Sequence, residues 1–382
     1  MKRTGMKISP GPTLVALMLA VSLLAIALPA KAQDLAAERD MTLTIIGDVR
    51  DVDINLFPLP QPQSLGLVFV HEISEPGALS LRIHFTIQRS GEAWGIQVKD
   101  ENGDVVWSTW NSAVSGDGFW SDEIAGEKVT IDVYSSKPSN LLQLKVDQVA
   151  IGRSKITPVS ITEPNQLRSI NGQAGWIVDL GRSVARLRFV GDNGKMYVCT
   201  AFLVTSDLMM TNQHCISSTS EMESTLVDFD YDTDGSPGLT LRLSALLETD
   251  YALDYSVIRL VRPVGRTPFE LATTSLADGQ QLLIIQHPGG EPKQISLEDC
   301  TVDGVQVTGR LGTPTDFGHQ CDTKGGSSGS PVLEFGGRTV VGLHHLGIRE
   351  GSSELYNRAS HIQLVLDDLD PVVRAEIEGG QQ

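Results

Sequence analysis

The chain has 382 residues, and its 30 basic and 47 acidic residues give a formal net charge of −17. This acidic balance argues against nucleic acid or an anionic membrane surface as a partner. The length is sufficient for two domains. Residues 1–32 have the order of a secretory signal: basic residues, an apolar run from Leu14 to Leu28, and a small-x-small cleavage site at Ala30-Lys31-Ala32.

The apolar run of this signal is short for a membrane span, which needs about 20 residues. A retained N-terminal anchor is the alternative interpretation. Cleavage would remove four basic residues and no acidic ones, which leaves a formal charge of −21. No later segment is long and apolar enough to cross a bilayer. We therefore expect a secreted or periplasmic protein that is not integral to the membrane.

Residues 33–150 predict an all-β accessory domain. Apolar and polar residues alternate in several short stretches, as in strands with one buried face. The segment Asp100-Glu101-Asn102-Gly103-Asp104 is typical of a turn between two such strands. Regular spacing of short strands favours a β-sandwich of jelly-roll type. The alternating apolar residues are Leu81, Ile83, Phe85 and Ile87, then Trp94, Ile96 and Val98, then Val129, Ile131 and Val133, then Leu142, Leu144 and Val146.

Four of the five tryptophans fall in this domain, at positions 94, 107, 110 and 120. Aromatic rings of this kind stack on sugars, so one interpretation is a glycan or protein contact through the accessory domain. We favour a role in the core of the sandwich. Residues 151–174, where Gly, Ser, Thr, Pro and Asn are frequent, predict a linker to the next domain.

Residues 175–382 predict a second domain of short strands and loops. It opens with a hairpin pattern: Val184 to Val190, the turn Gly191-Asp192-Asn193-Gly194, and Lys195 to Val204. Strand periodicity alone does not distinguish a barrel from a second sandwich. The architecture of this domain therefore has to be inferred from its motifs.

The segment from Cys321 to Val332 is dense in glycine and serine. An acyl-transfer serine needs a hydroxyl on a tight turn and backbone N–H groups that converge on the carbonyl oxygen as it becomes negative. Gly326 and Gly329 give the backbone around Ser328 that freedom. Ser328 is the candidate nucleophile, and the N–H groups of Gly326 and Ser328 are the candidate oxyanion hole. Taken alone, such a segment is more often an ordinary loop.

Two upstream segments supply partners for this serine. His214 follows the apolar stretch Ala201 to Val204 and is the candidate general base. Asp254 directly precedes the strand-like run Val257 to Val261 and is the candidate to orient the imidazole. Asp250 is the alternative, because Asp250-Tyr251 and Asp254-Tyr255 are near duplicates, but it would leave an aspartate inside that strand.

The ordered residues His214, Asp254 and Ser328 resemble those of the trypsin/chymotrypsin-type serine peptidases, over roughly residues 175–370. The loop Gly326 to Pro331 is similar to the nucleophile loop of the bacterial glutamyl-endopeptidase-like (V8-like) branch. The resemblance implies two six-stranded antiparallel barrels with the active cleft between them, a C-terminal helix near residues 361–369, and no metal or organic cofactor. It also implies a structural role for His287, in His287-Pro288-Gly289-Gly290.

Four cysteines in an exported chain allow disulfides, with three possible pairings. The resemblance implies a bridge between Cys199 and Cys215, which would tie the strand before the histidine to the histidine turn. Cys300 with Cys321 would then brace the segment that leads to Ser328. The alternative, a Cys/His metal site, lacks close CxxC spacing.

An acidic run with alternating spacing has the residue type of a calcium site but lacks a complete ligand loop ending in glutamate. We expect it to be a solvated acidic loop, and no metal is predicted. Its members are Asp228, Asp230, Asp232 and Asp234.

The residues expected to form the substrate pocket conflict with one another. Thr323 and His344 match positions that bind an acidic side chain in glutamyl endopeptidases. Asp322 matches the carboxylate that selects Lys or Arg in trypsin-like enzymes. Pointing into the pocket, it would repel a glutamate side chain, whereas turned outward it would not matter. Ser327 stands where vertebrate trypsins carry an aspartate that pairs with a newly cleaved N-terminus, so that activation switch is not expected.

These motifs together predict a secreted serine endopeptidase that hydrolyses protein or peptide substrates through an acyl-enzyme intermediate. The first alternative is a non-catalytic binding protein in which the peptidase-like domain is a scaffold. The second is an esterase that uses the same three residues. Removal of residues 33 to about 170 as a propeptide is a further possibility that the sequence leaves open.

Overall fold

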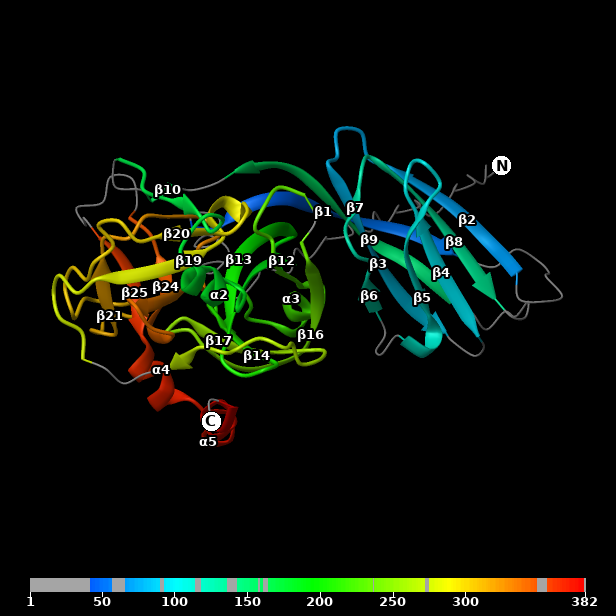
Figure 1. The fold of residues 1–382 in the computed structure, drawn as a ribbon. Coiled ribbons are helices and arrows are strands. Elements are labelled where there is room, and N and C mark those ends of the chain that lie inside the picture. The colour runs from blue at the N-terminus through cyan, green and yellow to red at the C-terminus, as the bar shows by residue number, and fades with distance from the viewer. Residues whose placement is uncertain are drawn as a thin grey trace, which may run out of the picture.

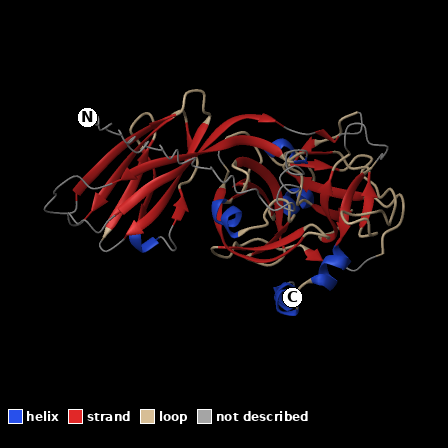
Figure 2. Ribbon diagram, turned by 180° about the vertical axis from the view of Figure 1, so that it is seen from behind, coloured by secondary structure: helices blue, strands red, loops and turns tan. Residues whose placement is uncertain are grey.

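The computed structural model describes residues 42–56, 66–89, 93–113, 118–135, 143–156, 159–160, 164–235, 237–271, 275–348 and 356–380. These residues are mostly strands, with a few short helices (Figure 2). None of the described helices is long and apolar enough to cross a membrane. The expected signal at residues 1–32 and the alternating residue Leu142 lie outside the described residues.

The N-terminal part consists of two layers, with strand orders β1-β9-β3-β6 and β2-β8-β4-β5, and the short strand β7 also pairs with β3 in the first layer. The pairs β1–β9, β2–β8, β3–β6 and β4–β5 are those of one long antiparallel hairpin rolled up into two sheets, which is a jelly-roll sandwich. Its strands are β1 (Thr44–Leu56), β2 (Gly66–Ser74), β3 (Ser80–Arg89), β4 (Trp94–Lys99), β5 (Val105–Trp110), β6 (Gly118–Trp120), β7 (Ile124–Ala125), β8 (Lys128–Ser135) and β9 (Gln143–Ile156).

The core of this sandwich is formed by the alternating apolar residues that the sequence pattern indicated. Leu81, Ile83 and Phe85 on β3 are buried, as are Trp94 on β4 and Ile131 on β8. The turn Asp100–Asp104 joins β4 to β5, and the N–H of Gly103 donates to the carbonyl of Asp100. The one-turn 3₁₀-helix η1 (Asn111–Ala113) follows β5. The expected linker at Ile151 begins within β9, which continues to Ile156.

The first barrel has six strands in the order β12-β15-β16-β17-β14-β13, and pairing of β12 with β13 closes it. The predicted hairpin is present as β12 and β13. The strands are β12 (Val184–Val190), β13 (Lys195–Leu203), β14 (Leu208–Thr211), β15 (Leu226–Phe229), β16 (Leu239–Asp250) and β17 (Tyr255–Leu260); helices α2 (Gly175–Gly181) and α3 (Thr219–Ser224) accompany them.

The second barrel is built on the order β20-β19-β23-β24-β25-β21. Isolated bridges between Val302 and His319 and between Gln281 and Thr301 connect β21 back towards β19. Its elements are β11 (Arg168–Ser169), β18 (Glu270–Leu271), β19 (Leu282–Gln286), η2 (Pro288–Gly290), β20 (Gln294–Ser296), β21 (Asp316–His319), β23 (Pro331–Glu334), β24 (Thr339–Leu346) and β25 (Asn357–His361). Helix α4 (Ile362–Asp368) is the predicted C-terminal helix, and α5 (Pro371–Gly380) follows it.

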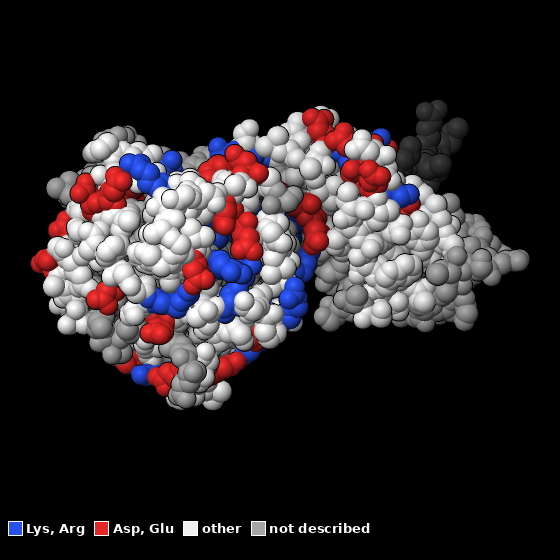
Figure 3. Space-filling model, in the orientation of Figure 1, with Lys and Arg blue, Asp and Glu red and all other residues white. Residues whose placement is uncertain are grey.

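The sandwich and the first barrel share one sheet. Strand β1 pairs with β9 of the sandwich and also with β13 of the barrel, so it extends from one part into the other (Figure 1). Charged side chains of both signs gather along the boundary between the sandwich and the first barrel, which we call the seam (Figure 3). Arg82 of β3 donates to the carbonyl of Ser224 at 2.7 Å, and Arg242 of β16 pairs with Asp122 at 2.6 Å. The two parts are therefore joined by backbone and by ion pairs.

A second connection reaches the segment before Ser328. The short strand β10 (Val159–Ser160) pairs antiparallel with β22 (Thr323–Lys324). The hydroxyl of Thr44, at the start of β1, donates to the carbonyl of Gly325 at 2.8 Å. The first strand of the sandwich and the short strand that follows the sandwich in the chain thus both contact the glycine-rich loop.

Candidate active site

His214 lies in a turn that directly follows β14. The N–H groups of Cys215 and Ile216 both donate to the carbonyl of Asn212, which forms the turn. A disulfide between Cys199 and Cys215 fastens this turn to β13. The second predicted disulfide, Cys300–Cys321, is also present. The imidazole of His214 is fully buried, so its position depends on its neighbours.

Asp254 holds the imidazole of His214 from one side. Its Oδ2 lies 2.7 Å from Nδ1 of His214, and its Oδ1 accepts the backbone N–H of the same residue at 3.0 Å. Asp254 comes directly before β17, at a left-handed φ of 53°. Asp250 is the last residue of β16, and its carboxylate caps the N–H of Leu253 at 2.7 Å. The structure therefore pairs Asp254, and not Asp250, with the histidine.

Burial by itself would raise the pKa of the Asp254 carboxyl. The charge of Arg310 and the contacts with His214 and His345 outweigh burial and hold the pKa well below its ordinary value. The carboxylate is thus ionised at neutral pH. In this state it accepts a proton-bearing Nδ1, which leaves Nε2 of His214 as the nitrogen that can take up a proton.

The loop with Ser328 packs against the strand and turn that carry His214. The N–H of Thr200 on β13 donates to the carbonyl of Ser328 at 2.8 Å, and Sγ of Cys215 is 3.9 Å from the same oxygen. The hydroxyl of Thr200 donates to the carbonyl of Gly326 at 2.9 Å. Ser328, which is 4% exposed, is therefore brought next to the histidine turn, although 113 positions separate it from Cys215.

The backbone N–H groups of this loop fall into two sets. Those of Ser327, Gly329 and Ser330 donate to the carbonyls of Lys324, His344 and Ser327, respectively. Among the residues that the structure describes, the N–H groups of Gly326 and Ser328 donate to no such acceptor. Gly326 has a φ of 96°, a region that favours glycine. These two N–H groups are the ones that the sequence predicted for an oxyanion hole.

The three predicted pocket residues are all buried close to the loop. Thr323 lies on β22, and His344 on β24 faces His319, with 3.1 Å between Nδ1 of the former and Nε2 of the latter. The carboxylate of Asp322 accepts the backbone N–H of Gln166 at 2.8 Å. Burial lowers the pKa values of His319, to about 3, and of His344. Both imidazoles are therefore neutral at neutral pH.

Two groups beside Asp254 were not foreseen from the sequence. His345 Nδ1 lies 3.2 Å from Oδ2 of Asp254, and Nη1 of Arg310 lies 3.1 Å from Oδ1. The pair His344-His345 within a strand pattern was the available signal, because successive strand residues face opposite sides. Arg310 lies in an irregular segment, where hydrophobic periodicity does not predict which way a side chain points.

The acidic run, which begins at Asp228 within β15, forms ion pairs. Burial opposes ionisation of Asp228, but Arg188 and Arg186 hold its pKa at about 2. Arg266 pairs with Asp230 at 2.6 Å, and Lys293 with Asp232 at 2.9 Å. Three of the four carboxylates are therefore bound by cations and do not form the solvated loop that we expected.

His287 has a structural position, as the resemblance implied. Its Nδ1 lies 3.0 Å from the carbonyl of Glu291, and its N–H donates to the hydroxyl of Thr200. The residue precedes the turn η2, in which Gly289 and Gly290 both have positive φ. The N–H of Gly289 donates to the carbonyl of Gly325, so this turn supports the loop before Ser328.

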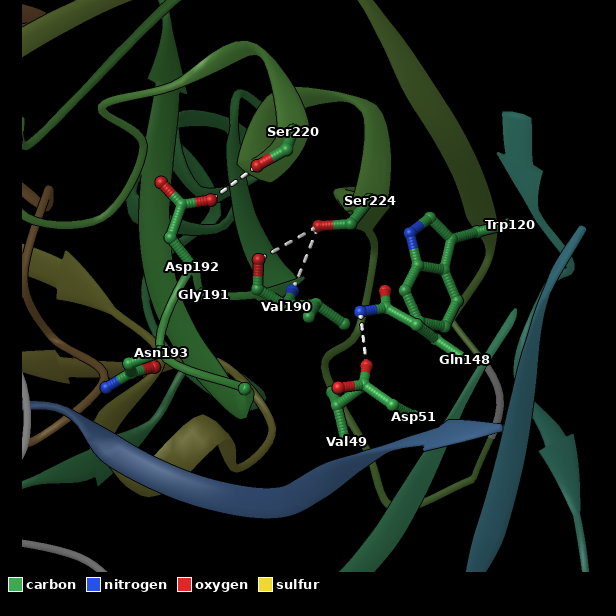
Figure 4. A pocket seen from close by; sticks show the side chains of 11 residues that line it. Val49, Asp51, Trp120, Gln148, Val190, Gly191, Asp192, Asn193, Ser220 and Ser224 are labelled. Carbon is green, nitrogen blue, oxygen red and sulfur yellow. Dashed lines mark hydrogen bonds between the residues drawn. The ribbon is translucent and has the colours of Figure 1, made fainter. Parts of the chain in front are cut away.

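A cleft of about 500 Å³ lies between the sandwich and the first barrel (Figure 4), and His214 is not among the residues that line it. Its polar side chains bond mostly to other lining groups. Gln148 donates to Asp51 at 3.0 Å, and Ser220 bonds to Asp192. Trp120, which lines it, is 6% exposed. Of the remaining tryptophans of the sandwich, Trp94 is in the core, Trp107 stacks on Phe85, and Trp110 is 42% exposed.

Residues 199–343 match the family model described as trypsin-like peptidase domain. This part of the chain is therefore similar to trypsin-like peptidase domains. The match extends from the first bridging cysteine to β24, and it includes the histidine turn, Asp254 and the glycine-rich loop. With its closed six-stranded barrel and additional sheets, the fold is consistent with the predicted two-barrel peptidase fold.

Two curated relatives align with about the same fraction of the chain. Secreted RxLR effector protein 73 of Plasmopara viticola is 29% identical over 183 residues, which are 43% of this chain and 45% of the relative. Uncharacterized protein y4fB of Sinorhizobium fredii is 30% identical over 190 residues, 44% of this chain and 28% of the relative. The chain thus spans less than half the length of either.

Among solved structures, the active form of the Rv3671c protease from M. tuberculosis is similar at 16% identity and a TM-score of 0.42, covering 60% of this chain and 93% of that one. The scabies mite inactivated protease paralogue S-I1 has 14% identity and a TM-score of 0.39, covering 50% and 96%.

Proposed function

We propose that this protein is a serine endopeptidase in which Ser328 is the nucleophile, His214 the general base and Asp254 its orienting carboxylate. The observation that carries the proposal is the buried pair of His214 and Asp254, 2.7 Å apart, beside the loop of Ser328. A buried imidazole with one nitrogen held by an ionised carboxylate presents the other as a base. The trypsin-like peptidase domain supports the same assignment.

The reaction then proceeds in two stages. His214 takes the hydroxyl proton of Ser328 as its oxygen attacks the peptide carbonyl, and the N–H groups of Gly326 and Ser328 stabilise the resulting oxyanion. The protonated His214 gives its proton to the leaving amine as the C–N bond breaks, which produces the acyl-enzyme. A water molecule, activated by His214, hydrolyses this ester and releases Ser328.

We further propose a preference for an acidic side chain before the cleaved bond, as in the glutamyl-endopeptidase-like branch. Thr323 and His344 are the residues that would contact it. The contact of Asp322 with the N–H of Gln166 supports this choice, because a carboxylate already engaged by the backbone is less available to bind Lys or Arg. A peptide library tests it, and dominant cleavage after Lys or Arg would refute it.

A fluorophosphonate probe tests the assignment of the nucleophile. Covalent labelling is expected for the wild type and is expected to disappear in Ser328→Ala. Ser244→Ala is the matched control and should label normally, because it removes a hydroxyl that donates to the carbonyl of Leu260, at the opposite end of β17 from Asp254. A folded wild-type protein that does not label would favour a scaffold role. Peptide and ester substrates assayed in parallel separate the peptidase from an esterase.

We propose export as the setting of this activity. Two disulfides suggest an oxidising compartment, which agrees with the composition of residues 1–32. Mass spectrometry of protein recovered from the periplasm or the medium should find an N-terminus near residue 33. A protein that retains residues 1–32 would support the anchor instead.

A further inference from the structure

Two adjacent histidines on β24, His344 and His345, contact different groups. His344 faces His319. His345 lies between two carboxylates: its Nδ1 is 3.2 Å from Oδ2 of Asp254, and its Nε2 is 2.8 Å from Oδ2 of Asp316 on β21. All five side chains are buried. His345 therefore connects the carboxylate beside His214 to a second carboxylate in the second barrel.

The ring of His345 is positively charged at neutral pH. Burial alone lowers its pKa, but the carboxylates of Asp316 and Asp254 outweigh burial and raise the pKa to about 9. An imidazole donates from both ring nitrogens only when each carries a proton, and both nitrogens here face carboxylate oxygens. The neighbouring imidazoles of His319 and His344 are neutral at this pH, so they add no positive charge around it.

Asp254 depends on such contacts for its orientation. Its left-handed backbone is a conformation that the surrounding structure has to maintain. One carboxylate oxygen faces the ring nitrogens of His214 and His345, and the other faces the backbone N–H of His214 and the guanidinium of Arg310. Arg310 is itself held by the carbonyl of Tyr251 at 3.1 Å. The carboxylate is thus fixed by partners from both barrels.

We propose that His345 is a positioning residue for the peptidase reaction, which, anchored by Asp316, fixes the carboxylate of Asp254 and thereby the direction of the His214 ring. The inference rests on the proposed function. His345 acts through Asp254, so its loss should lower the rate of the chemical step and leave substrate binding nearly unchanged. Asp316 contributes to the same positioning, because its carboxylate holds Nε2 of His345, the ring nitrogen that does not face Asp254.

Kinetics of three variants test the geometry. His345→Phe keeps an aromatic ring but donates no hydrogen bond, and kcat should fall about 10- to 100-fold with KM little changed, the range for losing a hydrogen bond to a charged group. His345→Gln keeps one donor and should retain an intermediate kcat. His361→Gln is the matched control: this histidine on β25 bonds the carbonyl of Val305 at 2.9 Å, and its replacement should leave kcat unchanged.

Two further readouts distinguish positioning from general support of the fold. Asp316→Asn removes one of the two carboxylates that keep His345 protonated, so the alkaline loss of kcat should begin at a lower pH than in the wild type. The low-field proton resonance of the hydrogen bond between His214 and Asp254 should shift in His345→Phe and stay in place in His361→Gln. Asparagine has nearly the shape of aspartate, which keeps this part of the test informative if the phenylalanine variant unfolds.

The outcomes separate this inference from the function on which it rests. A wild-type protein that neither labels with a fluorophosphonate nor cleaves peptides would overturn both. An active wild type whose folded His345→Phe and Asp316→Asn variants keep the kcat, the pH profile and the low-field resonance would overturn the role of His345 alone. Reduced kcat together with a shifted profile and resonance would support it.

Discussion

Gly329 follows Ser328 at a φ of 86°, and a Cβ there would overlap the carbonyl oxygen of Thr200. Both the backbone conformation and the space therefore require glycine. We expect Gly329→Ala to abolish fluorophosphonate labelling and to destabilise the protein by about 3 kcal/mol or more, since backbone strain and overpacking add. Chemical denaturation and labelling measure the two effects.

Gly279 provides the control for this substitution. It has a φ of 78°, but a Cβ there has nothing within 4 Å. Gly279→Ala should cost only the conformational strain, about 1–2 kcal/mol, and should leave labelling intact. Equal losses of stability in the two variants would show that the contact with Thr200 contributes nothing.

The charge of His345 predicts how stability depends on pH. Its pKa in the folded protein is about 9, above the ordinary value for histidine, so folding favours the protonated ring. The stabilisation is complete below the unfolded pKa of about 6.5 and is lost as pH rises through 9. The urea midpoint should fall over this interval, and Asp316→Asn should reduce that fall. If the difference in urea midpoint between the wild type and Asp316→Asn does not change with pH, this prediction is wrong.

At the scale of single residues, the sequence indicates as candidates those that stand in a motif. His214 and Ser328 have characteristic neighbours in the chain, and the place of Asp254 directly before a strand favours it over Asp250. His345 and Asp316 have no motif, because their partners come from other strands of the fold. A direction such as that of the Asp322 side chain depends on a contact with Gln166, far away in sequence, and could not be predicted.

At the scale of elements, the contact of β1 with the glycine-rich loop has a measurable consequence. Thr44→Val keeps the shape of the side chain but removes the hydrogen bond to the carbonyl of Gly325. The carbonyl of Gly325 and the N–H of Gly326 belong to the same peptide group. Loss of the hydrogen bond from Thr44 should therefore loosen the proposed oxyanion hole. We expect the labelling rate to fall about two- to tenfold, with little change in thermal stability.

The matched control for that change is Thr86→Val, within the sandwich, where the hydroxyl lies 3.5 Å from the carbonyl of Lys145. It should label at the wild-type rate. An equal reduction in both variants would mean that the effect comes from general stability, and no reduction in Thr44→Val would show that the loop does not depend on β1.

Strands were the elements that the sequence predicted well, because alternation with period 2 reports one buried face directly. The hairpin of β12 and β13 and the sandwich strands β3, β4 and β8 are where the pattern indicated. The pattern failed at Ile151, where β9 continues through residues that have the composition of a linker. Pairing with β1 maintains the strand there, and pairing partners are not visible in a local window.

At the scale of the whole molecule, the seam predicts that the two parts stay together when the chain between them is cut. The pairing of β1 with β13, the bond from Arg82 to Ser224 and the ion pair of Arg242 with Asp122 all cross it. A specific protease site introduced at residues 161–163 should give two fragments that co-elute from a sizing column without denaturant.

Separation of the fragments into two peaks would contradict this and would support removal of the N-terminal part as a propeptide. Labelling after the cut gives the functional counterpart. If the sandwich supports the loop of Ser328, the cut complex should label like the intact protein, and dissociation in mild denaturant should reduce labelling. The sequence predicted two units but not their shared sheet, since neither composition nor periodicity reports which edges meet.

Strand β1 has a consequence for how the protein is made. Because synthesis runs from the N-terminus, β1 and β9 have emerged from the ribosome before β13 emerges. A completed sandwich then offers the exposed edge of β1 as a template against which the nascent β13 can align. Without the barrel, this edge of β1 would be an unpaired edge strand that can pair with other chains and aggregate. Translation that stops between residues 160 and 195 should therefore yield an aggregating product, whereas translation that continues past residue 203 covers that edge from within the same chain.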